Sequence, residues 1–200
     1  MMKENKSKIK DIIIDNISKS FQEKKVISNL SGNIVGGATT CLFGPSGSGK
    51  TTLIRILLNL DTVDEGKILN IDKLKKSVVF QEDRLCENLT SLTNVKMAMA
   101  KDVDPFLANQ LLIELGLEEN INQKVAELSG GMKRRVAIAR ALASEYDLLI
   151  LDEPFKGLDN EIREKTIKIV KRQTLGKTVV LVTHDLKEAE LLETNSYIYF

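Results

Sequence analysis

The segment from Gly44 to Thr51, GPSGSGKT, constrains the fold of this chain more than any other stretch. It matches the pattern G-x-x-x-x-G-K-[S/T], follows the mostly apolar run ATTCLF, and precedes residues whose leucines recur at helical spacing. A buried strand, a glycine-rich loop and a helix N-terminus in this order are typical of an α/β fold that surrounds a phosphate with backbone N–H groups. We expect Gly44, Gly47 and Gly49 to allow the close, left-handed path of the loop.

The residues of this loop predict how a nucleotide would be held. Lys50 is expected to reach the β- and γ-phosphates, and the hydroxyl of Thr51 is expected to bind Mg²⁺. A chance glycine turn is the alternative, but the strand before the loop and the helix after it argue against one. The residues predicted to bind the nucleotide here are Gly44, Pro45, Ser46, Gly47, Ser48, Gly49, Lys50, Thr51 and Thr52.

The other apolar stretches predict the elements around this loop. In the first third, turn residues separate IIID, ISKSF and VISNLSGNI, which we expect to form antiparallel strands, and KILNI and SVVFQ predict two further strands. Later in the chain, helices at 132–144, 159–172 and 185–193 alternate with the strands DLLILD, TVVLVT and SYIYF. Short apolar strands that alternate with helices indicate a parallel sheet covered on both faces.

The stretch between these two parts has a different character. Strand signals are absent there, and LTNVKMAMA and DPFLANQLLIELGL are interpreted as helices inserted into the α/β core. Two hundred residues, 42% of them apolar, suit one domain with a real core. We therefore expect a single domain over residues 1–200. Its α/β core and antiparallel β subdomain would occupy about 1–84 and 132–200, and a helical subdomain about 85–131.

Polar side chains follow three of the predicted parallel strands. LLILDEP places Asp152 and Glu153 after one strand, His184 follows TVVLVT, and Gln81 follows SVVF. Ligands bind at the carboxyl edge of open α/β sheets, where such side chains gather. Asp152 fits a water-mediated Mg²⁺ ligand, and Glu153 fits a base that polarises water against a γ-phosphate. The alternatives are a solvated acidic pair, a structural histidine and an ordinary loop glutamine.

A second glycine-rich segment, LSGGM, covers Leu128–Met132 and precedes the helix-forming run KRRVAIARALA. Ser129, Gly130 and Gly131 are therefore expected at a helix N-terminus, with free backbone N–H groups and the positive end of the helix dipole. Such a terminus can bind an anion. The chain thus carries two segments suited to a phosphate, far apart in the sequence.

Composition and charge argue against several other classes of protein. The net charge of +1 provides no overall field that would attract nucleic acid. Cys41 and Cys86 do not make a disulfide framework and fit a cytosolic setting, with Cys41 expected in the core. The apolar runs are too short to span a bilayer, and the N-terminal MMKENKSKIK lacks the apolar stretch of a signal peptide. The chain is therefore expected to be soluble by itself.

Six segments in order resemble the motifs of the nucleotide-binding subunits of ATP-binding-cassette (ABC) transporters, along nearly the whole chain. They are GPSGSGKT (Walker A), VVFQEDRL (Q-loop), LSGGM (signature), LLILDE (Walker B), GLD (D-loop) and VTHD (switch histidine). The LSGG segment separates this family from other phosphate-loop kinases and GTPases. The resemblance implies a phosphate-loop NTPase core with a parallel sheet, an N-terminal antiparallel β subdomain and an inserted helical subdomain.

The resemblance also implies an ATPase that works as a head-to-tail dimer. Each ATP would lie between the Walker A loop of one protomer and the signature of the other. Ser129, Gly130 and Gly131 would contact the γ-phosphate of the partner's ATP, and Asp159 would cross the interface near the attacking water.

Other roles follow from the same resemblance. Glu153 would act as the base, His184 would hold the γ-phosphate, and Gln81 would join the metal and water, so that Mg²⁺ would be bound by Thr51, Gln81 and Asp152. Phe21, which lies 23 positions before Gly44 in the sequence, would stack on adenine, where tyrosine is commoner in the family. The alternative for Phe21 is a core aromatic of the first sheet.

Three features depart from the family pattern. The signature ends in Met132 where glutamine is usual, and we expect this residue to tune the ATPase rather than abolish it. The stretch from Lys50 to Gln81 is short. The chain stops at SYIYF, so neither a C-terminal regulatory domain nor a second cassette is expected.

The function implied is the cytosolic ATPase of a membrane transporter, peripheral on the inner face of the membrane. Its expected partners are a transmembrane permease subunit, a second nucleotide-binding subunit of the same or a closely related sequence, and an extracellular substrate-binding protein. The permease would dock near Glu82, Asp83, Arg84 and Leu85. FQEDRL is similar to the Q-loop of importers for nitrate, sulfonate and taurine-type substrates.

Two alternatives remain open at this point. A soluble ABC protein could act on nucleic acid, on ribosomes or in cofactor assembly, although the helical insert is short for the DNA-repair relatives and only one cassette is present. A cassette that binds ATP without hydrolysing it is the other, and the presence of Glu153 and His184 argues against it.

Overall fold

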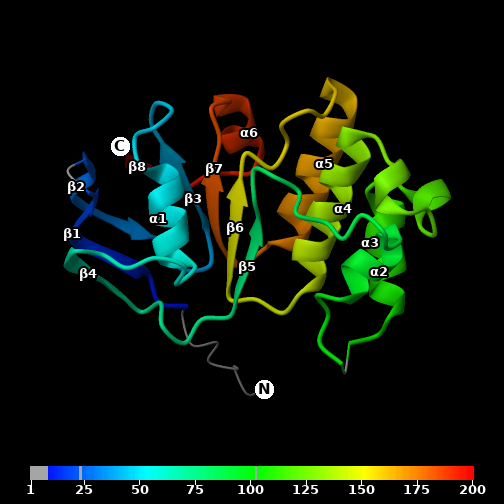
Figure 1. Cartoon of the computed structure of the whole chain (residues 1–200), viewed down its shortest axis with the longest axis horizontal. Helices are drawn as coiled ribbons and strands as arrows, with labels where there is room; N and C mark the ends of the chain where they lie inside the picture. The colour runs from blue at the N-terminus through cyan, green and yellow to red at the C-terminus, as the bar shows by residue number, and fades with distance from the viewer. Residues whose placement is uncertain (1–8, 23, 102) are drawn as a thin grey trace, which may run out of the picture.

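A computed structural model describes residues 9–22, 24–101 and 103–200, and this part of the chain contains two sheets (Figure 1). The first is antiparallel with the order β2-β1-β4, formed by β1 (Ile12–Phe21), β2 (Lys24–Ile34) and β4 (Glu65–Leu69). The second is parallel with the order β5-β6-β7-β3-β8. Its strands are β3 (Thr39–Phe43), β5 (Lys76–Val79), β6 (Leu148–Asp152), β7 (Thr178–Val182) and β8 (Ser196–Tyr199).

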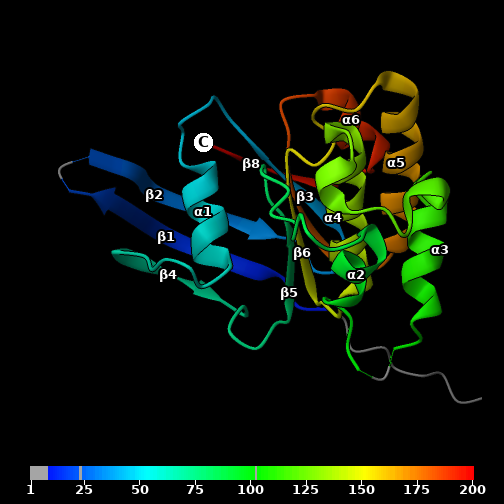
Figure 2. The ribbon, with the colours of Figure 1, turned by 45° about the vertical axis from the view of Figure 1, so that its right-hand side comes forward.

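Helix α1 (Lys50–Leu57) lies between the two sheets, and the other helices cover the opposite face of the parallel sheet (Figures 1 and 2). These helices are α2 (Ser91–Lys96), α3 (Phe106–Glu114), α4 (Gly130–Ala143), α5 (Asn160–Gln173) and α6 (Leu186–Leu191). The segment LLIL of β6 is apolar because both faces of the strand are covered. Leu148 and Ile150 pack on the face toward α1, and Leu149 and Leu151 pack on the face toward the other helices. The predicted fold class is confirmed.

The helical stretch is inserted between β5 and β6. It contains α2, α3 and two 3₁₀ turns, Glu118–Asn120 and Val125–Glu127, and it leads directly into α4. Asn94 is buried and fixes the start of the stretch, because its side chain bonds both the N–H and the carbonyl of Cys86. None of the helices in the described ranges has the length and apolar character needed to cross a membrane.

Several predicted boundaries differ from the structure. IIID and ISKSF belong to one strand, β1, whose register shifts around Asn16 at a φ of 51°. Only the first three residues of KILNI lie in β4, which ends at Leu69 and pairs with β1 in the antiparallel sheet. The helical spacing of Leu53, Ile56, Leu57 and Leu60 predicts a helix from Lys50 to Leu60. Helix α1 ends at Leu57 instead, because Leu60 is exposed and Asn59 has a left-handed φ of 58°. Apolar spacing continues past the end of the buried surface there, so it overestimates the helix.

Candidate functional site

The glycine loop connects β3 to α1, and its glycines meet two different needs. Gly47 and Gly49 have left-handed φ values of 77° and 105°, which glycine adopts without strain. Gly44 was also expected to be left-handed, and this detail is wrong. A Cβ at Gly44 would lie 2.9 Å from the Cβ of Phe200 and 3.0 Å from the Oγ of Ser48. Gly44 is therefore required by space, while Gly47 and Gly49 are required by backbone conformation.

The loop has the donors that a phosphate needs. Lys50 is buried, and its Nζ donates to the carbonyls of Gly44 (2.8 Å) and Pro45 (2.7 Å), so the cation lies inside the curve of the loop. The Oγ of Ser48 is buried and has no hydrogen-bond partner among the described residues. A Cβ at Gly47 would meet no heavy atom within 4 Å, so the rim of the loop is open there. These features fit a phosphate bound at the N-terminus of α1.

Asp152 and Glu153 follow each other at the carboxyl end of β6 but lie in different environments. Asp152 is buried, and burial, followed by the negative charge of Glu153, raises its pKa. The N–H of Glu153 donates to the carbonyl of Val182 at 2.9 Å, which continues the pairing of β6 with β7. Glu153 then adopts a φ of 46°, which is rare for a residue with a side chain and is typical of functional sites.

The carboxylate of Glu153 lies between two cationic or protonatable side chains. Lys156 Nζ donates to Oε2 at 2.8 Å, and Nε2 of His184 lies 3.1 Å from Oε1. The hydrogen bond from Lys156 and the nearby positive charges of Lys156 and Lys50 lower the pKa of Glu153. The side chain is therefore an anion at neutral pH, as a base must be.

Two hollows adjoin these carboxylates. The first, of about 440 Å³, brings together the three residues predicted to bind Mg²⁺, Thr51, Gln81 and Asp152. The second, of about 220 Å³, brings together Glu153 and His184. Lys156 lines both. The described residues contain no cluster of three or more His, Cys, Asp or Glu side chains that could hold a metal. A cation in the first hollow would therefore need oxygen ligands from the phosphates as well, as Mg²⁺ commonly has.

The Q-loop is held by two arginines of α4 that the sequence reasoning missed. Arg134 donates to the carbonyls of Phe80 (2.7 Å) and Gln81 and lies 3.2 Å from the carboxylate of Asp83. Arg140 donates to the carbonyls of Asp83 (2.9 Å) and Arg84 (2.7 Å). The run KRRVAIARALA predicts a helix but assigns no role to its arginines. Their partners lie more than fifty positions earlier, so no local pattern could have revealed them.

The signature segment begins α4 as predicted. Ser129 is the N-cap residue, and its Oγ accepts from the N–H of Met132 at 3.3 Å. Met132 is partly buried and packs against the helical core rather than pointing away from it. Asp159 has the same position on α5, where it accepts from the N–H of Ile162 at 3.0 Å. Gly131 approaches this second loop, because a Cβ there would lie 3.5 Å from Leu158.

The signature and the glycine loop do not meet within one chain. Helix α1 packs on one face of the parallel sheet and α4 on the other. The residues that line the two hollows include none from 128–132. Ser129, Gly130 and Gly131 therefore belong to neither hollow of their own chain.

Phe21 ends β1 and is 45% exposed, so the alternative that it is a core aromatic is wrong. Lys19 lies over its ring, with Nζ 5.4 Å from the centroid, and is itself held by Asp61 and Asp64. The ring is thus held at the surface by its neighbours. Stacking on adenine remains a prediction for this residue.

Comparison with known proteins supplies the family context. Residues 27–156 match the family model described as ABC transporter. The glutamine transport ATP-binding protein GlnQ of Escherichia coli is 36% identical, over 88% of this chain and 81% of its own length. The taurine import ATP-binding protein TauB of Pseudomonas aeruginosa is 39% identical, over 90% of this chain and 74% of its own.

A solved structure has the same arrangement of elements. The dimeric structure of MJ0796, described as a bacterial ABC transporter cassette, is similar with a TM-score of 0.83 and 34% identity, over 94% of both chains. A second structure of that cassette, in a post-hydrolysis state bound to ADP and Pi, gives a TM-score of 0.81 and 32% identity over the same shares.

Proposed function

The chain belongs to the ABC transporter family, and from this premise we propose that it is the ATP-binding and ATP-hydrolysing subunit of an importer. The observation that carries the proposal is the position of Glu153. Its ionised carboxylate lies at the end of β6, and its Oε1 is 3.1 Å from Nε2 of His184. Lys156 lines the hollow that contains Glu153 and also the neighbouring hollow. The neighbouring hollow contains Thr51, Gln81 and Asp152.

In the proposed reaction, ATP is the substrate and the glycine loop binds its phosphates through backbone N–H groups and Lys50. Thr51, Gln81 and Asp152 would hold Mg²⁺, which neutralises charge on the phosphate oxygens when bound. Glu153 orients and polarises the attacking water as the base. His184, next to Glu153, holds the γ-phosphate, and Phe21 stacks on the adenine.

A second chain completes the site. The separation of the two phosphate-type segments within one chain supports a dimer in which Ser129, Gly130 and Gly131 contact the ATP of the partner, with Asp159 beside them. Two solved structures of a similar cassette are described as dimeric, which supports a dimer of this chain. The helical stretch of about 85–131 would move as a subdomain when the dimer closes. Because Arg134 and Arg140 connect α4 to the Q-loop, a shift of α4 along with this stretch would carry Gln81 and the signature together.

Coupling to transport follows from the surface next to Gln81. The guanidinium of Arg84 lies 3.8 Å over the ring of Phe80, and Glu82 and Arg84 are exposed. A permease helix docked here would contact the Q-loop and would move when the Q-loop moves. The relatives are transport or import ATP-binding proteins by name, which favours a membrane permease over nucleic acid or ribosomes as the partner. The chain would then lie on the cytoplasmic face of the membrane, with a substrate-binding protein on the other side.

Steady-state hydrolysis tests this function directly. The purified chain should release phosphate from ATP when Mg²⁺ is present and stop when EDTA is added. The rate per protomer should rise with protein concentration, because only dimers are competent. A Lys50→Met variant serves as the inactive reference. Binding of ATP without any turnover, at every protein concentration, would contradict the proposal.

The pKa of Glu153 gives a pH prediction. Glu153 acts only as a carboxylate, so activity falls as the pH drops through its pKa. Lys156→Met removes the largest cause that lowers this pKa, and the pKa should rise. The acidic limb of the profile of kcat against pH should therefore move to higher pH, while Lys165→Met, which breaks an exposed pair with Glu161, leaves it in place. An unmoved limb would mean that another group controls it.

A further inference from the structure

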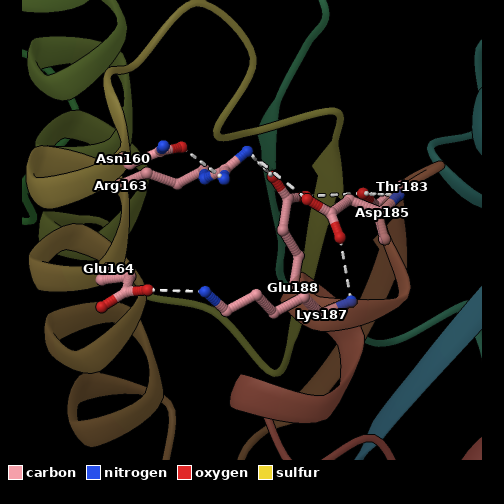
Figure 3. A network of polar contacts seen from close by, with 7 residues as sticks. All are labelled: Asn160, Arg163, Glu164, Thr183, Asp185, Lys187 and Glu188. Atoms are coloured by element: carbon pink, nitrogen blue, oxygen red, sulfur yellow. Dashed lines mark hydrogen bonds and ion pairs between the residues drawn. The ribbon is translucent and has the colours of Figure 1, made fainter.

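The loop that carries His184 is fixed on both sides by a single hydroxyl (Figure 3). Thr183 Oγ1 donates to Glu188 Oε2 at 2.5 Å and accepts from the N–H of Asp185 at 3.1 Å. Thr183 and Glu188 are both buried. The residues before and after His184 are thereby attached to the first turn of α6, and the position of the imidazole depends on this attachment.

Arg163 extends the same network to the neighbouring helix. From α5 its Nη1 lies 3.4 Å from Asp185 Oδ2 and 4.0 Å from Glu188 Oε1, and its Nη2 donates to Asn160 Oδ1 at 2.8 Å. Asn160 directly follows Asp159, the N-cap of α5. One guanidinium therefore connects the histidine loop to the first turn of α5, which Asp159 caps.

The network also borders the reactive hollow. Thr183, Asp185 and Glu188 line the hollow that contains Glu153 and His184. A carboxylate buried as deeply as that of Glu188 is costly unless it is hydrogen-bonded and paired, and Thr183 and Arg163 meet this requirement. Removing Arg163 would take away the positive charge next to the buried carboxylate of Glu188. Because Thr183 bonds this carboxylate, we expect the histidine loop to change position together with α6.

We propose that Arg163, Thr183 and Glu188 are positioning residues that hold His184 against Glu153 and connect its loop to the first turn of α5, which Asp159 caps. The proposal rests on the proposed function, in which His184 serves the ATP of its own chain and Asp159 reaches that of the partner. The network then links the two ATP sites of the dimer.

A double-mutant cycle on the full chain tests this role. Arg163→Met should lower kcat about tenfold and leave the KM for ATP within about twofold, because it acts through His184 after ATP is bound. In a His184→Ala background, where the rate is already low, the same change should lower kcat less than about twofold. An equal fold loss in both backgrounds, or a loss carried by KM, would overturn the proposal.

Two further comparisons separate positioning from general support. Lys187→Met breaks the Lys187–Glu164 pair (2.7 Å), which joins the same two helices at an exposed place, and should leave kcat within about twofold. Thr183→Val should lower kcat as Arg163→Met does, and Thr183→Ser, which keeps the hydroxyl, should restore most of it. A Thr183→Ser rate as low as that of Thr183→Val would contradict the role of the hydroxyl.

The activity of the unaltered chain separates the proposed function from the positioning network. If the unaltered chain hydrolyses no ATP, the proposed function is wrong. If it hydrolyses ATP and the effects of Arg163→Met and His184→Ala multiply independently, only the positioning network is wrong. The thermal unfolding midpoint of each variant shows which substitutions leave the fold intact, and the Thr183 pair decides the matter if Arg163→Met unfolds.

Discussion

Glu153→Gln should lower the turnover of ATP by about a hundredfold or more while ATP still binds, because removal of a general base costs this much. The amide keeps the size of the side chain and its place between Lys156 and His184, but it cannot polarise the attacking water. ATP bound between two protomers would then persist. The variant should therefore accumulate as an ATP-bound dimer, seen by sedimentation, while the unaltered chain returns to its resting state after turnover.

A matched change provides the control for Glu153→Gln. Glu190 is an exposed glutamate of α6 outside both hollows, and Glu190→Gln should keep the rate of the unaltered chain. Turnover by Glu153→Gln at the rate of the unaltered chain would remove Glu153 from the role of base. In that case Asp152, at the end of the same strand, would be the next carboxylate to substitute.

Ser129→Arg should also abolish hydrolysis, by a different route. The long cationic side chain would occupy the N-terminus of α4, where the γ-phosphate of the partner's ATP is expected, so the ATP site that this signature completes could not close. Because the glycine loop of the same chain is untouched, the affinity of the monomer for ATP should stay within about twofold. Turnover and equilibrium binding of a fluorescent ATP analogue at low protein concentration measure the two quantities.

Loss of a helix cap is a possible side effect of Ser129→Arg, and α2 offers the control. Thr90 caps α2 as Ser129 caps α4, accepting from the N–H of Thr93 at 3.1 Å. Thr90→Arg should cost a similar amount of stability, about 1 kcal/mol, and leave hydrolysis intact. A large loss of monomer affinity in Ser129→Arg would instead mean that LSGGM serves the nucleotide of its own chain.

The parts of the site that the sequence predicted correctly are local in the chain. The glycine loop follows from a strand, a loop and a helix in immediate succession, and the position of Ser129 at a helix N-terminus follows from the residues after it. Residues that follow parallel strands gather at the carboxyl edge of the sheet. In the structure Gln81 and Asp152 line one hollow together with Thr51, and Glu153 and His184 line another.

The parts that the sequence could not predict depend on contacts between distant segments. Arg134 meets the carbonyl of Phe80 from 54 positions away, and Arg163 meets Asp185 across 22 positions. Gly44 was assigned the wrong constraint for the same reason, since the atom that excludes a Cβ there belongs to Phe200. Helix ends were overestimated where apolar spacing ran beyond the buried surface, as at Leu60.

The central claim is that each ATP site takes its glycine loop from one chain and its signature from the other. Mixing Lys50→Met with Ser129→Arg in equal amounts tests it, because neither variant alone has a complete site. A head-to-tail mixed dimer contains one site in which both halves are intact, so hydrolysis should return to about a quarter of the rate of the unaltered chain. A mixture as inactive as its two components would contradict the claim.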